Sequence, residues 1–266
     1  MAGKSKSLRA TVFIAYFIML IPVGMVVITS FFSQEIVSFP PQGWSLKWYA
    51  NALVQREFSQ GFLASIEVAL IASLIGVPLG TLAALAITRR SFAGKEALKT
   101  LLLGPLAVPG VVAGTALFLF YLNLQDRLDV DIAGTLPGLI AAHVLLTIPW
   151  TVRVTLASLQ GLDLAAEEAA ANLGAHPFTV FYRITLPALR PGLVAAAMFS
   201  FIQSFENLEL TLLLVGPGMT TLPIVMLNYL EFRMDPTLSA IATIQIVIVA
   251  ALMLLTDRFV KLSRIV

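Results

Sequence analysis

Long apolar runs alternate with short polar segments along almost the whole chain. A helix needs about 20 apolar residues to cross the hydrocarbon core of a bilayer, and six runs are near or above that length. The pattern predicts membrane-spanning helices at 10–32, 61–88, 101–121, 137–159, 192–215 and 238–256. The first run is longer than a signal-peptide core and no small-residue cleavage site follows it, so we expect it to be retained.

Prolines and polar segments interrupt these runs. Pro105 and Pro109 stand near the start of the third run. Each proline removes a backbone donor and clashes with the preceding turn, so this helix should kink or break. Residues 34–60 form a mixed segment whose aromatic side chains suit a membrane interface, and residues 216–236 are predicted to be a loop.

Basic residues gather in alternate polar segments. Thirteen of the 17 lysines and arginines lie in the N-terminal segment, the 89–99 loop, the 153–190 region and the C-terminal tail. The positive-inside rule assigns those segments to the cytoplasm. Six spans put both ends on one side, so we expect one transmembrane domain, 1–266, with both termini and the 160–190 loop in the cytoplasm.

The overall composition agrees with a membrane protein and excludes several other classes. Hydrophobic residues make up 58% of the chain and charged residues only 12%, about half the share in soluble domains. The net charge of +2 and the lack of a basic run interleaved with aromatics argue against nucleic-acid binding. The chain has no cysteine, which excludes thiol catalysis and disulfides, and its two histidines lack metal-ligand spacing.

The 160–190 loop has the pattern of two short helices joined by a turn. Residues 164–173 are rich in strong helix formers, and Gly174 follows where a helix end favours positive φ. Pro177 stands where a second helix could begin. Three aromatic residues then share one face of that helix: Phe178, Phe181 and Tyr182. Such a face needs a cover, either a partner protein or the membrane surface.

The same loop resembles the EAA loop of ABC-importer permeases. The shared pattern is E-A-A, three residues, G, nine residues and I-x-L-P. Here it reads Glu168, Ala169, Ala170, Gly174, Ile184, Leu186 and Pro187. In that family the loop is cytoplasmic and docks into a cleft on the ATPase subunit. The resemblance implies a type I importer permease fold. We predict that the buried contact is supplied by Phe178, Val180, Phe181 and Tyr182. We also predict that Gly174 shapes the turn and that Glu168 caps the loop or forms a salt bridge within it.

The resemblance also implies a set of partners. The chain has no nucleotide-binding loop of its own. ATP and Mg²⁺ would therefore be bound by two partner ATPase subunits, while this chain binds no cofactor and is not itself an enzyme. A second, homologous permease subunit would complete the path, and a periplasmic solute-binding protein would deliver the solute. The implied location is the bacterial inner membrane, in contact with lipid.

Acidic residues in and near the spans are candidates for the solute path. Residues 213–223 resemble the spermidine and putrescine permeases. Residues 204–207, Ser-Phe-Glu-Asn, align with a serine and an acidic pair of that branch, and Asn207 stands in place of the second acid. A further acid, Glu209, lies three residues after Glu206, so we expect both on one helical face. Acids in a membrane should face the bundle interior or water. We predict a cation-favouring path lined by Glu206, Asn207, Glu209 and Glu67; the alternative is pairing with the partner subunit.

Another class of transporter also agrees with part of the pattern. Broken helices and intramembrane acids are compatible with an ion-gradient-driven secondary transporter. However, the chain shows no convincing inverted repeat, and such a carrier has no need of a docking loop. A scaffold or channel subunit explains the acids less well. His143 and Arg153 are interpreted as packing or interface residues.

Overall fold

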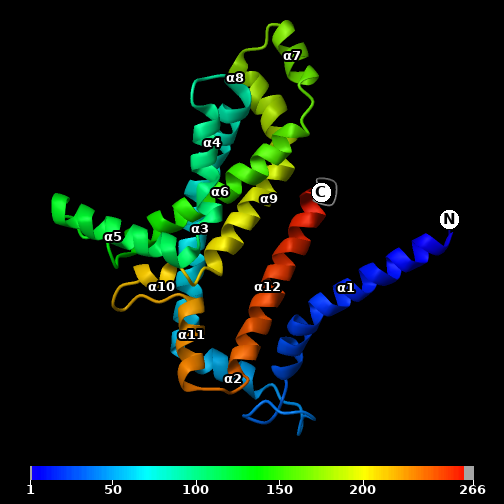
Figure 1. Ribbon diagram of the computed structural model, residues 1–266, viewed down its shortest axis with the longest axis vertical. Helices are drawn as coiled ribbons and strands as arrows, with labels where there is room; N and C mark the ends of the chain where they lie inside the picture. Colours follow the sequence, from blue (N-terminus) through cyan, green and yellow to red (C-terminus); the bar gives the residue numbers. More distant parts are fainter. Residues whose placement is uncertain (1, 261–266) are drawn as a thin grey trace. The chain divides into compact units, whose positions relative to one another are not determined.

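The computed structural model describes residues 2–260, and the side chains of residues 8–257. Every regular element within that range is a helix (Figure 1). The helices are α1 (Ala2–Thr29), α2 (Lys47–Val54), α3 (Arg56–Arg89), α4 (Lys95–Leu103), η1 (Gly104–Ala107), α5 (Gly110–Leu128), α6 (Leu136–Gln160), α7 (Ala165–Asn172), α8 (Pro177–Val180), η2 (Phe181–Thr185), α9 (Leu186–Phe205), α10 (Thr211–Leu214), α11 (Leu222–Phe232) and α12 (Thr237–Val260).

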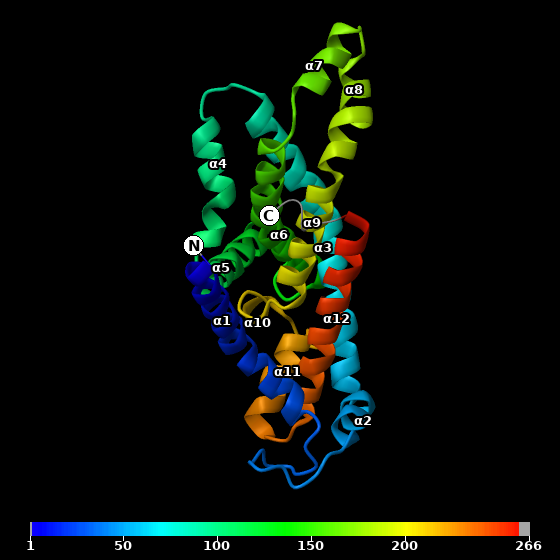
Figure 2. The same cartoon turned by 90° about the vertical axis from the view of Figure 1, so that its right-hand side faces the viewer.

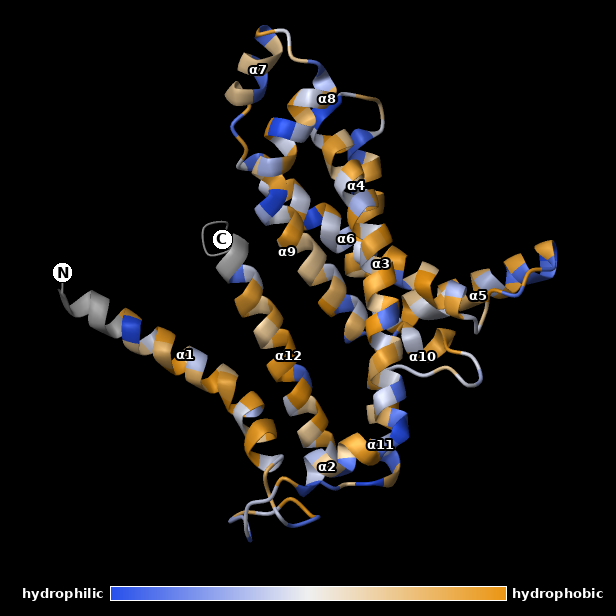
Figure 3. Ribbon diagram, turned by 180° about the vertical axis from the view of Figure 1, so that it is seen from behind, coloured by the Kyte–Doolittle hydropathy of each residue, from blue (hydrophilic) through white to orange (hydrophobic). Residues whose placement is uncertain are grey.

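The predicted all-α membrane architecture is confirmed. Within the described residues, five helical stretches are long and apolar enough to cross a membrane, or six when the bent pair 95–107 and 110–128 counts as one span. Figure 3 shows hydrophobic residues along most of α1, α3 and α12. The cytoplasmic placement of both termini stays a prediction. Part of its charge argument, the side chains of Lys4 and Lys6 and residues 261–266, lies outside the described residues.

The chain divides into two compact units, Met1–Ser59 with Val225–Ala250 and Gln60–Ile224 with Ala251–Val266. In the first unit, the Thr29 hydroxyl donates to Ser239 Oγ over 3.1 Å and the Asn51 amide donates to Thr237 Oγ1 over 2.9 Å. Most apolar side chains of α1 are exposed, and no residue in the most apolar 18-residue stretch of this helix is buried.

The second unit is built around α3, α6 and α9, which lie side by side (Figures 1 and 2). Gly76 and Gly80 form a G-x-x-x-G pair on α3, and such pairs let helix backbones approach closely. A Cβ added at Gly80 would lie 2.7 Å from the Thr151 Cβ, so glycine is required there. Where α6 meets α9, Ser158 occupies the space that a Cβ on Gly192 would need.

The third span breaks at the predicted prolines. The stretch 95–107 meets α5 at an angle of 111°, with Val108 extended and Pro109 at the N-cap of α5. An extended residue before a proline is the expected geometry, because the proline ring disfavours the helical region there. The predicted bounds of 101–121 were wrong, since the helical residues extend from Lys95 to Leu128 on both sides of the break.

Two further sequence predictions were wrong. Residues 222–232 form α11 instead of a loop. This apolar run is too short to signal a span, and short runs do not distinguish helix from strand or loop by pattern alone. The fifth span begins at Pro177 and ends at Phe205 instead of covering 192–215. The second helix of the 160–190 loop is therefore the first part of the same membrane helix.

Candidate functional site

The predicted turn in the 160–190 loop, hereafter the coupling loop, has the geometry that glycine favours. Gly174 has φ +79°, and its N–H donates to the Ala171 carbonyl over 2.9 Å. The Ala175 N–H donates to the Ala170 carbonyl over 3.0 Å. This pair of bonds is the Schellman motif, which ends a helix with one residue in the left-handed region. The glycine therefore sets the direction in which the chain leaves α7.

Side chains cap the start of both helices of the coupling loop. The Asp163 carboxylate accepts from the Ala165 N–H over 2.9 Å, at the start of α7. The His176 imidazole Nδ1 accepts from the Phe178 N–H over 3.3 Å, and Pro177 takes the first position of α8. Together with the turn, these caps define an α7–α8 hairpin that extends beyond the ends of α3 and α6 (Figures 1 and 2).

The predicted aromatic face lies uncovered on this hairpin. The ring centroids of Phe178 and Tyr182 lie 4.5 Å apart, and those of Phe181 and Tyr182 lie 5.4 Å apart. Phe178 is 64% exposed and Tyr182 is 52% exposed, while Leu173 at the turn is 89% exposed. Clustered exposed apolar side chains of this kind mark protein or membrane contacts.

Glu168 was predicted to form a cap or a salt bridge within the loop, but it is the neighbouring Glu167 that forms an ion pair, and its partner lies outside the loop. Arg89 Nη2 lies 2.6 Å from Glu167 Oε1, and the Thr185 hydroxyl donates to the same oxygen over 2.8 Å. Glu168 is exposed, and its side chain has no hydrogen bond or ion pair to another described residue. The sequence could not show this pairing, because Arg89 and Glu167 are 78 positions apart.

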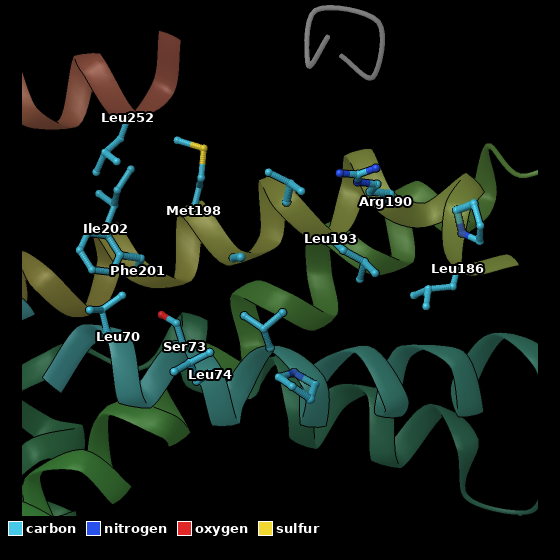
Figure 4. A pocket seen from close by; sticks show the side chains of 15 residues that line it. Leu70, Ser73, Leu74, Leu186, Arg190, Leu193, Met198, Phe201, Ile202 and Leu252 are labelled. Atoms are coloured by element: carbon cyan, nitrogen blue, oxygen red, sulfur yellow. The ribbon is translucent and has the colours of Figure 1, made fainter. Parts of the chain in front are cut away.

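The other predicted coupling residues differ in how exposed they are and in the helix to which they belong. Ala169 is exposed on α7, Ile184 is half-buried in η2, and Leu186 and Pro187 form the first turn of α9. The last two also line one end of a groove on the second unit (Figure 4). The I-x-L-P end of the motif is therefore part of the membrane helix rather than of the exposed hairpin.

The groove runs between α3 and α9 and has a volume of about 850 Å³. Its lining is apolar apart from Ser73 and Arg190. Figure 4 shows Leu186 and Arg190 at one end, and Leu70 with Ile202 at the other. No hydrogen bond joins Ser73 Oγ to another described group.

Two of the predicted path acids, Glu67 and Glu206, lie on the same helix faces as residues that line this groove. Glu67 precedes Leu70 by three residues on α3, and Glu206 follows Ile202 by four at the end of α9, so each shares a face with its groove residue. Both carboxylates are exposed within this chain. They continue these faces from Leu70 and Ile202, which Figure 4 shows at the end of the groove opposite Arg190.

The expectation that Glu206 and Glu209 lie on one helical face was wrong. Helix α9 ends at Phe205, and Glu206 is its C-cap. The Asn207 side-chain oxygen accepts from the Leu210 N–H over 3.1 Å, a local bond that competes with continued helix. Glu209 is exposed in the resulting break and packs against Gly110, where a Cβ would have no room.

His143 connects three helices around this break. The Thr211 hydroxyl donates to the Asn207 carbonyl over 2.7 Å, so it accepts from His143 Nε2–H, 3.0 Å away. Nδ1 is then the acceptor, and the Ser204 hydroxyl donates to it over 2.7 Å. These contacts assign the neutral Nε2–H tautomer and support the interpretation of His143 as a packing residue, with the added role of holding the break in place.

Known proteins resemble this chain over most of its length. Residues 76–264 match the family described as binding-protein-dependent transport system inner membrane component. The chain is 31% identical over 224 residues to the putrescine transport system permease protein PotI of Escherichia coli (strain K12), covering 84% of this chain and 79% of that protein. It is 27% identical over 249 residues to the spermidine/putrescine transport system permease protein PotC of Haemophilus influenzae, covering 94% of each.

The fold is also similar to a solved structure. A bacterial ABC transporter involved in the import of the acidic polysaccharide alginate contains a chain that superposes with a TM-score of 0.73. The match covers 96% of this chain and 94% of that one at 18% identity, so the likeness concerns the fold alone. Since that transporter imports an acidic polymer, the shared fold does not indicate which solute is carried.

Proposed function

From the premise that this chain belongs to the family of binding-protein-dependent transport system inner membrane components, we propose that it forms half of the translocation path of an ATP-driven importer. In this proposal ATP and Mg²⁺ bind to two partner ATPase subunits, and a homologous second permease completes the path. A periplasmic binding protein delivers the solute, and the complex resides in a bacterial inner membrane. The family assignment supports this proposal over the gradient-driven alternative.

The α7–α8 hairpin is the observation that carries this proposal. Its residues match the EAA pattern, and its first helix ends in a Schellman turn at Gly174. Leu173, Phe178 and Tyr182 are uncovered. Within the described chain no other element covers these side chains. Docking of an ATPase subunit would remove their apolar surface from water, which favours association by about 25 cal/mol per Å² of buried apolar area.

We further propose that the solute is a small cation of the polyamine type. Glu206 and Glu209 are exposed beside the C-terminal end of α9, where the helix dipole adds negative potential. Broken membrane helices use such C-terminal ends to bind cations in other transporters. The relatives named for putrescine and spermidine support the same solute class.

The first experiment purifies the tagged chain in mild detergent, identifies its partners by mass spectrometry and measures ATP hydrolysis with and without the binding protein. We expect a second permease and an ATPase whose activity the binding protein stimulates. A chain that purifies alone from membranes where its partners are expressed would refute the importer proposal.

The solute is tested separately in proteoliposomes that contain the complete complex. Uptake of labelled putrescine should fall several-fold when Glu206 and Glu209 are both replaced by glutamine, while ATPase co-purification is unchanged. Glu231→Gln is the matched control, because Glu231 is also exposed but lies in the other unit. Equal uptake by the double variant and the control would refute the cation path.

A further inference from the structure

One carboxylate oxygen of the coupling loop binds two groups from elsewhere in the chain. Glu167 Oε1 lies 2.6 Å from Arg89 Nη2 and accepts from the Thr185 hydroxyl over 2.8 Å. Arg89 is the last residue of α3, and Thr185 is the last residue of η2, directly before α9. A single side chain of α7 therefore joins the end of α3 to the residue that directly precedes α9.

The environment of this contact makes it stronger than an ordinary surface ion pair. The side chains of Arg89 and Glu167 are only 28% and 16% exposed, and Thr185 is buried. Partial shielding from water strengthens charge-assisted hydrogen bonds, whereas exposed pairs contribute little.

The chain itself does not connect α7 closely to α3. The hairpin continues directly into α9 through α8 and η2, but α3 is separated from α7 by 75 residues of chain, 90–164. Arg90, the neighbour of Arg89, is exposed and has no side-chain partner in the described chain. The Glu167 contact is thus the direct polar link between α7 and the end of α3.

We propose that Glu167 is the positioning residue of the coupling loop, which makes α3 and α9 move with the α7–α8 hairpin. This inference rests on the proposed importer function. A displacement imposed on α7 passes to both membrane helices only through contacts that do not yield. The glutamate of the E-A-A pattern, Glu168, has no such link within this chain and is left free for the ATPase.

The test compares transport with ATP hydrolysis in the complete complex. Glu167→Ala and Arg89→Ala should keep the ATPase bound and active, while solute uptake per ATP hydrolysed falls by about fivefold or more, as expected for a coupling contact. Glu167→Gln retains an acceptor for both partners and should recover part of the loss. Arg90→Ala and Glu96→Ala are the matched controls, because both side chains are exposed outside the contact.

A charge exchange keeps the proposal testable if a single variant folds poorly. Arg89→Glu combined with Glu167→Arg should restore coupling relative to either reversal alone. Wild-type coupling in Glu167→Ala would overturn the inference. Loss of the bound ATPase would also overturn it, since Glu167 would then be a docking residue. Absence of an ATPase from the wild-type complex would instead refute the proposed function on which the inference rests.

Discussion

Gly174 provides the sharpest test of how the coupling loop works. Its φ of +79° lies in the left-handed region, where an L-residue costs about 1–2 kcal/mol and a β-branched residue more. A Cβ added there would meet no atom within 4 Å, so the penalty of Gly174→Val comes from the backbone alone. Helix α7 has only eight residues, and helices this short are marginal without support at their ends.

We expect Gly174→Val to weaken the coupling of ATP hydrolysis to solute transport without disrupting the membrane fold. A penalty of about 1–2 kcal/mol lowers the population of the native turn by roughly 5- to 30-fold relative to alternatives. Gly174→Val should therefore retain the membrane fold but transport fewer solute molecules per ATP hydrolysed. Gly174→Asn should lose less, because asparagine tolerates the left-handed region. Both quantities are measured in proteoliposomes that contain the complete complex.

Gly218 supplies the matched control. It has the same φ of +79°, and a Cβ there would also meet nothing within 4 Å, but it lies in the loop before α11. Gly218→Val thus imposes the same backbone penalty away from the hairpin. Normal coupling in Gly174→Val, or equal uncoupling by Gly218→Val, would refute the reasoning.

Three further predictions follow from packing and exposure. His143→Ala leaves Ser204 and Thr211 without their buried partner and should lower stability by about 1–3 kcal/mol, measured by thermal denaturation in detergent; an unchanged midpoint would contradict the assigned bonds. Gly76→Leu should abolish stable expression because Thr147 fills the space beside Gly76, whereas Gly24→Leu, with nothing within 4 Å, should express normally. Phe178→Ser should express and fold like the wild type yet retain less ATPase on purification; full retention would exclude this side chain from the docking contact.

Several features of the fold could be predicted because they depend on short stretches of sequence. The apolar runs indicate the membrane helices, and Pro109 marks the break in the third span. Gly174 and Pro177 mark the turn and the second helix of the loop, since backbone preferences of single residues decide both. The same local reasoning missed α11, because an 11-residue apolar run carries no decisive period.

The end of the fifth span shows where local reasoning stopped being sufficient. Residues 192–215 are apolar enough to predict continuous helix, yet α9 ends at Phe205. His143 holds the break through Ser204 and Thr211, 61 and 68 positions away. The Thr211 hydroxyl that His143 holds donates to the Asn207 carbonyl, a backbone acceptor at the break, and only the packed structure reveals this arrangement.

The sequence by itself determined the class of protein, the number of apolar runs and the EAA-like hairpin, because hydrophobic length and turn preferences act over a few residues. Tertiary structure alone decided that Glu167, and not Glu168, pairs with Arg89, and that the α3 and α9 faces bearing Glu67 and Glu206 border one groove. These relations depend on how helices pack, which brings together side chains that are distant in the chain and chooses between neighbours of identical chemistry.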